Sequence, residues 1–213
     1  MHVTSSLTIS STVGKRYRWR FCSAALVLLW ASAPTGAQQG KRVYISVDME
    51  GISGVSGDDQ ITAGAAEYGR SRKLMAADAN AAIEGARLAG ATDIVVNDSH
   101  GGQRNILPED LAPGVRLITH TFKRHGMMEG LDESFDAVLL VGYHAKADAP
   151  RGLFAHTGSG VVRDLTINGR SVGEGGTNAA LAAWYGVRPQ IDGELLNVYT
   201  LYKVFKRSGH LAR

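Results

Sequence analysis

The sequence of 213 residues contains a single cysteine, Cys22, which lies close to the N-terminus. A disulfide framework needs several cysteines, and so does a zinc site that is built from thiolates. The sequence therefore excludes both kinds of site. Any transition metal that this chain binds must be held by histidine, aspartate and glutamate side chains.

The first 37 residues contain no acidic residue, and their four lysines and arginines all lie in the stretch KRYRWR. An apolar stretch, FCSAALVLLWASA, follows, and the small residues TGA precede Gln38. This order is typical of a secretion signal. We therefore predict a signal peptide over residues 1–37 and a periplasmic or secreted location. The apolar stretch is shorter than the roughly 20 residues of a membrane-spanning helix, so we expect no stable membrane insertion after signal removal. A retained N-terminal anchor is the alternative.

The rest of the chain has no excess of charge of either sign. The whole sequence has 23 basic and 20 acidic residues. Without the four basic residues of the signal, 19 basic residues face 20 acidic ones, a formal charge of −1. A nucleic-acid-binding protein normally carries a basic surface. We therefore expect no nucleic-acid partner.

The chain after residue 37 alternates between apolar runs and amphipathic segments. Uninterrupted apolar strands that alternate with helices are typical of a parallel sheet covered on both faces. We predict an α/β fold of three layers, with a mostly parallel sheet, helices on both faces and a late β-hairpin. The expected strands are 42–47, 93–97, 115–119 and 137–143; the expected helices are 65–89, 127–131 and 175–185. The hairpin is expected over 161–174, with its turn at Asn168-Gly169, a strong hairpin-turn signal.

Polar side chains follow three of these strands where each one ends, in the motifs VDMEG, VNDSHGG and VGYHA. Ligands of open α/β sheets bind beyond the carboxyl ends of the strands. The three motifs therefore bring their polar residues to one edge of the sheet. These residues are Asp48, Glu50, Asp98, His100 and His144.

Asp48 and Glu50 are two residues apart, so an extended chain points both carboxylates to the same side. Two converging carboxylates repel each other unless one is protonated or a cation lies between them. A divalent metal removes this penalty, and the two histidines favour zinc and similar metals over magnesium. The sequence therefore predicts a metal site at this edge.

Two later residues each allow two interpretations. Glu174, in VGEGG, begins a predicted helix, where an acid is stabilised by the helix dipole; on the pattern alone this structural role is preferred. His156, in LFAHTGSG, is either a solvated loop histidine or a general acid/base beside a metal.

These motifs resemble those of the zinc-dependent D-aminopeptidases, a family whose type member is encoded with a bacterial dipeptide transport system. The resemblance runs from about Lys41 to Val187 through SVDMEGISG, VNDSHGG, MMEGLD, VGYHA, the His156 loop and INGRSVGEGGTNA. It implies an α/β fold with two zinc ions per chain at the strand ends, and Asp48 as the bridging carboxylate. Four further ligands are implied, Glu174 now among them: Glu50, His100, His144 and Glu174.

The resemblance also implies a catalytic role for His156, because it matches the family histidine that is described as a nucleophile. A metal-activated water is itself a competent nucleophile. We therefore expect His156 to orient that water, to move protons or to stabilise the tetrahedral intermediate.

The activity that the resemblance implies is hydrolysis of N-terminal D-residues, notably D-alanine, from short peptides by a metallo-aminopeptidase. The family assembles into a ring-like homodecamer. A secreted member would meet D-alanine peptides from cell-wall turnover. Short peptides with an N-terminal D-residue and further copies of the chain are thus the expected partners.

The chain departs from the family after Val187, where the family has a further buried strand and a long C-terminal region. Residues 188–213, RPQIDGELLNVYTLYKVFKRSGHLAR, contain no clear β-branched run. We expect a catalytic domain over residues 38–187 and a divergent tail over 188–213, from a truncated or frameshifted reading frame. Part of the pocket wall and of the subunit interface would then be missing. Two alternatives stay open: another metal-dependent hydrolase such as a phosphatase, and an inactive metal-binding fragment.

Overall fold

The computed structural model of the chain describes residues 40–191. The predicted signal peptide over residues 1–37 lies outside the described residues, and so does most of the predicted divergent tail, from residue 192 onward. No helix in the described part of the chain combines the length and the hydropathy that a bilayer crossing requires.

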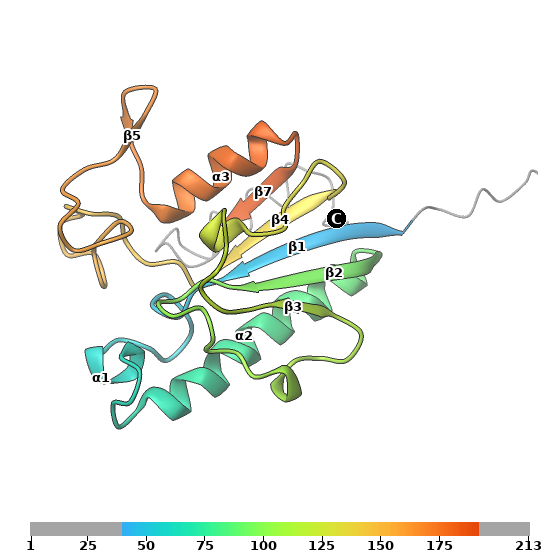
Figure 1. Ribbon diagram of the computed structural model, residues 1–213, viewed down its shortest axis with the longest axis horizontal. Helices are drawn as coiled ribbons and strands as arrows, with labels where there is room; N and C mark the ends of the chain where they lie inside the picture. The colour runs from blue at the N-terminus through green and yellow to red at the C-terminus, as the bar shows by residue number, and fades with distance from the viewer. Residues whose placement is uncertain (1–39, 192–213) are drawn as a thin grey trace, which may run out of the picture. The chain divides into compact units, whose positions relative to one another are not determined.

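Five parallel strands form the central sheet, in the order β3-β2-β1-β4-β7 (Figure 1). Their bounds are β1 Lys41–Val47, β2 Ala91–Asp98, β3 Arg116–Ile118, β4 Ala137–Val141 and β7 Arg188–Ile191. Strand β1 is central, and its last residue, Val47, lies opposite Asp98 of β2 and Val141 of β4. The three middle strands therefore end level with one another, at one edge of the sheet.

Helix α2, Tyr68–Leu88, covers one face of the sheet (Figure 1). Its buried residues Met75, Ala79 and Ile83 recur at steps of four, which places them on one stripe of the helix. This stripe packs against the side chains of β1 that point to the same face, such as Ile45. The helix predicted over 65–89 is thus confirmed, with its first residue at Tyr68.

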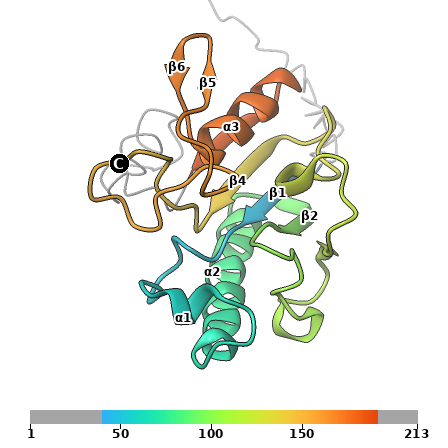
Figure 2. The ribbon, with the colours of Figure 1, turned by 60° about the vertical axis from the view of Figure 1, so that its left-hand side comes forward.

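The opposite face of the sheet carries helix α3, Glu174–Trp184, and the short 3₁₀ helix η2, Gly126–Met128 (Figure 2). A second apolar cluster forms there, because Tyr44 points to the other side of the strand from Ile45. Tyr44 packs with Met128 and with Ala182 of α3. Helices therefore cover both faces, and the predicted three-layer α/β fold is confirmed. The helix predicted over 127–131 is shorter, a single turn.

Three short elements complete the described chain: helix α1 Asp58–Ile61, the 3₁₀ helix η1 Pro108–Asp110, and the hairpin of β5 Thr166–Ile167 and β6 Arg170–Ser171. Asn168 and Gly169 both have positive φ, 51° and 74°. Two consecutive positive φ values are the mark of a type I′ turn. The late hairpin is confirmed, although its paired part is shorter than the predicted 161–174.

Strand β7 lies within the segment in which the sequence indicates no strand after Val187. It pairs in parallel with β4, with Val138 opposite Pro189. The absence of a clear β-branched run after Val187 therefore did not exclude a short strand. A strand of four residues with a proline carries little β signal, and proline is tolerated in it because β7 lies at the edge of the described sheet.

Candidate metal centre

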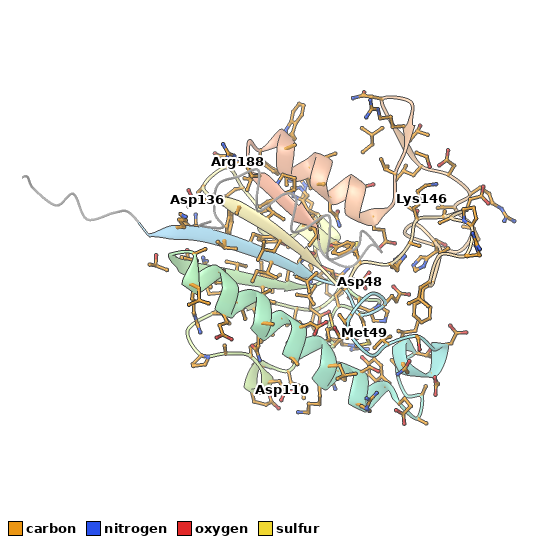
Figure 3. The ribbon with its side chains drawn as sticks, turned by 180° about the vertical axis from the view of Figure 1, so that it is seen from behind. Asp48, Met49, Asp110, Asp136, Lys146 and Arg188 are labelled. Atoms are coloured by element: carbon orange, nitrogen blue, oxygen red, sulfur yellow. The ribbon has the colours of Figure 1, made fainter. Side chains whose placement is uncertain are left out.

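The backbone at the sheet edge brings three ligand-bearing segments together. The ladder continues one step past the strands, because Asp48 N donates to Val141 O (2.8 Å) and Ser99 N donates to Val47 O (2.8 Å). Figure 3 shows Asp48 at this end of the sheet, far from Arg188, at which β7 begins. The segments that follow β1, β2 and β4 therefore leave the sheet side by side.

Two glycines permit an unusually close approach at this edge. Gly51 N donates to Gly142 O (2.7 Å). A Cβ atom on Gly142 would lie 2.2 Å from Asp48 O, and one on Gly51 would lie 2.3 Å from Tyr143 O. Gly142 also has a φ of +71°. Only glycine fits at these two positions, and the glycine of the motif VGYHA was a sequence signal for this contact.

Five predicted ligands converge where these segments leave the sheet. His100 Nδ1 lies 3.2 Å from Asp48 Oδ1 and 3.5 Å from Glu50 Oε2. His144 Nε2 lies 3.4 Å from Glu50 Oε2, 3.2 Å from Glu174 Oε2 and 3.7 Å from Asp48 Oδ2. Two trios of potential ligands share Asp48: one contains Glu50 and His100, the other His144 and Glu174. One aspartate thus faces two adjoining sets of donors.

The two histidines are fixed in the tautomers that a metal site needs. His100 Nε2 lies 2.9 Å from Ile61 O, and His144 Nδ1 lies 2.9 Å from Ala145 O. A carbonyl only accepts, so each of these nitrogens carries the hydrogen when the ring is neutral. The lone pairs of His100 Nδ1 and His144 Nε2 then point at the carboxylates. Such carbonyl partners commonly orient metal-binding histidines, and the sequence did not indicate them.

The electrostatics of the cluster call for a cation. Asp48 is 1% exposed, and its Oδ2 atom has no hydrogen-bond partner. Burial raises the pKa of Asp48. Among residues 40–191, no lysine or arginine lies within ion-pair distance of the three carboxylates. A buried carboxylate oxygen without a donor is costly unless a cation or proton reaches it.

The histidines supply the positive charge in the metal-free cluster. Burial alone lowers the pKa of His100, but hydrogen bonds to Asp48 and Glu50 outweigh it and raise the pKa to about 10. Burial likewise lowers the pKa of His144, and the carboxylates of Glu174 and Asp48 raise it to about 9. Burial opposes ionisation of Glu174, yet its contacts with His144 and the chain hold its pKa below the usual range. Carboxylate and imidazole donors at these distances fit zinc.

His156 lies at the rim of the cluster, with a side chain that is 29% exposed. Its ring stacks on His144, with centroids 3.9 Å apart and an interplanar angle of 12°. His156 Nδ1 lies 2.8 Å from Phe154 O, so this nitrogen carries the hydrogen of the neutral ring and Nε2 is free. Nε2 lies 3.7 Å from Glu174 Oε1. The loop histidine therefore faces the cluster with Nε2.

Asp98 is brought to the same edge but does not join the cluster. Its carboxylate accepts hydrogen bonds from the backbone N–H groups of Asn105 and Ile106 and from the Asn105 side chain. It therefore closes the loop that carries His100. Glu174 is the first residue of α3 and also faces His144, so the helix-terminus position and the cluster position coincide.

Comparison with known proteins places this chain among related sequences and structures. A family model described as D-aminopeptidase, peptidase M55, matches residues 41–190. The D-aminopeptidase of Bacillus subtilis (strain 168) is 43% identical over 146 residues, which are 68% of this chain and 53% of that protein.

A solved structure, the Zn-dependent D-aminopeptidase DppA from Bacillus subtilis, a self-compartmentalizing protease, is also similar. It superposes with a TM-score of 0.67 at 43% identity, over 68% of this chain and 53% of that one. The present chain thus spans about half the length of the relative that it matches. The match of the family model, which covers most of the chain, shows that this chain belongs to the D-aminopeptidase family, peptidase M55.

Proposed function

We propose that this chain carries the catalytic metal centre of a zinc-dependent D-aminopeptidase, which removes N-terminal D-residues such as D-alanine from short peptides. One observation carries the proposal: Asp48 is shared by two adjoining trios of potential ligands, all buried except the half-buried Glu174. Membership of the family supports the zinc and the substrate class.

The proposed centre holds two zinc ions per chain. One ion would be bound by Glu50 and His100, the other by His144 and Glu174, and Asp48 would bridge them. Bound zinc supplies Lewis-acid activation of the scissile carbonyl and of the attacking water. The residues of the chain hold the ions in place, exclude bulk water from Asp48 and set the tautomers of both histidines.

His156 is proposed to move the proton during hydrolysis. Its Nε2 atom is free to accept a proton, because Phe154 O holds the hydrogen on Nδ1. Its partial exposure leaves it accessible to a substrate, and the stacking on His144 fixes the plane of the ring. His156 would take a proton from the attacking water and deliver it to the leaving amine. This role needs no covalent bond between the histidine and the substrate.

The partners and the location belong to the same proposal. The related protein DppA is described as a self-compartmentalizing protease, so we propose that the present protein also forms a homo-oligomer. Residues 1–37 are proposed to direct it to the periplasm or the exterior, where D-alanine peptides from the cell wall occur. Light scattering of the purified protein, and sequencing of the N-terminus of the exported chain, test these two points.

The activity is tested with the purified full chain and the variant His156→Ala. We expect release of D-alanine from D-alanyl peptides and not from L-alanyl peptides or phosphate monoesters. The variant is expected to lose at least about 100-fold in kcat while its zinc content stays unchanged. His125→Ala, a change at an exposed histidine outside the cluster, serves as the control.

Three results would contradict the proposal. A protein without zinc excludes the metal centre. Hydrolysis of phosphate monoesters in place of D-alanyl peptides would identify a phosphatase. Bound zinc without any hydrolysis would leave an inactive metal-binding fragment.

A further inference from the structure

A second layer of polar side chains lies beneath the candidate ligands, on the side of the sheet that α3 covers. We call it the buried hydroxyl cluster, and its members are Ser46, Ser99, Tyr143 and Asn178. All four side chains are buried. They come from four different segments: β1, the end of β2, the end of β4, and α3.

Short hydrogen bonds join the cluster into one network. Ser46 Oγ lies 2.6 Å from Ser99 Oγ, 2.7 Å from the Tyr143 hydroxyl and 2.6 Å from Met127 O. Asn178 Nδ2 donates to the Tyr143 hydroxyl at 2.9 Å. Ser46 is therefore the centre of the network and Tyr143 connects it to the helix.

The donors and acceptors of the network balance. Asn178 donates to Tyr143, Tyr143 donates to Ser46, and Ser46 donates to the carbonyl of Met127. Ser99 Oγ shares a hydrogen bond with Ser46 Oγ and also lies within donor distance of Met127 O (3.2 Å) and Asn97 O (3.3 Å). Each hydroxyl thus has at least one group to donate to and one to accept from. A fully satisfied buried network of this kind is directional, unlike apolar packing.

Each member of the cluster adjoins a candidate ligand in the sequence. The pairs are Ser46 with Asp48, Ser99 with His100, Tyr143 with His144, and Asn178 with Glu174. The first three are one or two residues apart in the chain, and the last pair is one helical turn apart on α3. The network therefore connects, through short stretches of backbone, every segment that brings a ligand to the centre.

The connection to α3 depends on one side chain. In the described structure, two side chains of α3 form hydrogen bonds toward the sheet. Glu174 contacts His144, and Asn178 makes all the others. Without it, α3 would be held by apolar contacts such as that of Ala182. Such contacts permit small sliding movements, whereas metal ligands must be held within about 0.5 Å.

We propose that the buried hydroxyl cluster sets the relative positions of the four ligand-bearing segments, so that its members are positioning residues for the zinc centre. This inference rests on the proposed function. It assigns a role to residues that touch neither the metal nor the substrate. Loss of one hydroxyl should therefore lower the zinc affinity by more than a comparable loss of fold stability elsewhere in the chain does.

The test compares Tyr143→Phe and Ser46→Ala with two matched controls. Tyr44→Phe removes a hydroxyl from a fully buried tyrosine of β1 that donates only to Glu129 O. Ser71→Ala removes one from a buried serine of α2. Zinc affinity is measured in the full chain by competition with a chromophoric chelator, and the melting temperature is measured without zinc.

We expect each cluster variant to bind zinc on the order of tenfold more weakly than the wild type. The controls should lose less than about twofold in affinity, even where their zinc-free melting temperature falls as much. The double variant Ser46→Ala/Tyr143→Phe should lose less than the sum of the single effects, because both changes interrupt one network. The visible spectrum of the Co²⁺-loaded chain should change in the cluster variants alone.

The outcomes separate this inference from the proposed function. If the wild type binds no zinc, the proposed function fails. If the wild type binds zinc and both cluster variants bind it as tightly as the controls, the positioning role is wrong. Should Tyr143→Phe show no cooperative unfolding, Ser99→Ala replaces it, with the same expected weakening and the same contradicting result.

Discussion

At the scale of single residues, the centre is defined by carboxylates that the fold buries without a lysine or arginine beside them. Asp48 has one oxygen near His100 and one with no hydrogen-bond partner. The metal-free chain balances its carboxylates with protons on His100 and His144, whose pKa values are raised to about 10 and about 9. A metal ion has to displace these protons, because a ligating imidazole nitrogen must be free.

Zinc binding should therefore release protons and depend on pH. Both histidines are protonated near pH 7, so binding should release about two protons per chain. The affinity should rise as the pH increases toward the raised pKa values of about 9 and 10 and then level off. Calorimetry in buffers of different ionisation enthalpy measures the released protons. An affinity that stays flat between about pH 7 and 9 would contradict this account.

The zinc affinity should rise with pH, whereas the stability of the zinc-free chain should fall as the pH rises. A histidine whose pKa is higher in the folded than in the unfolded chain stabilises the fold fully below its unfolded value, about 6.5. That contribution is lost as the pH rises through the folded values of about 9 and 10. The melting temperature without zinc should therefore fall as the pH rises from about 6.5 to about 10.

At the scale of elements, the centre depends on how closely the segments after β1 and β4 approach each other. Gly142 has a positive φ, and a Cβ atom there would lie 2.2 Å from Asp48 O. The variant Gly142→Ala should lower the free energy of unfolding of the zinc-free chain by about 2–4 kcal/mol, from backbone strain and overpacking. Urea unfolding measures this change.

Gly85→Ala is the matched control for that prediction. Gly85 lies within α2, and a Cβ atom there meets nothing within 4 Å. Alanine should stabilise the helix there by about 0.5–1 kcal/mol. Equal effects of the two alanines would show that the close approach at Gly142 does not exist.

The sequence predicts those elements whose pattern is long and periodic. The stripe of α2 and the apolar run of β1 were identified, and the strand-end residues Asp48, His100 and His144 lie together in the structure. Strand β7 was missed, because RPQI contains a proline and is only four residues long. Asp98 lies at a strand end, as the ligands do. Only its hydrogen bond with Asn105 shows that it holds the loop together and does not face the metal site.

The buried hydroxyl cluster shows a different limit of sequence reasoning. Ser46, Ser99 and Tyr143 look unremarkable in the sequence, since serine and tyrosine occur in many strands and loops. Their contact depends on the register of β1 against β2 and β4, which places the ends of the strands level. Strands β1, β2 and β4 are far apart in the chain, so the pattern of any one strand does not reveal which residues of the other two it faces.

At the scale of the whole molecule, the described half of the family architecture already contains the complete candidate centre. The chain spans 53% of its relative from Bacillus subtilis. The six candidate residues, from Asp48 to Glu174, lie within the segment 41–190 that the family model matches. Metal binding should therefore be a property of this chain.

The zinc content of the dialysed full chain tests the central claim most directly. Mass spectrometry of the metal should find two zinc ions per chain in the wild type. It should find one ion in Glu174→Gln, which removes a ligand of one trio, and none in Asp48→Asn, which removes the shared ligand. A wild type with no zinc, or an Asp48→Asn variant that keeps both ions, would contradict the account of a two-ion centre bridged by Asp48.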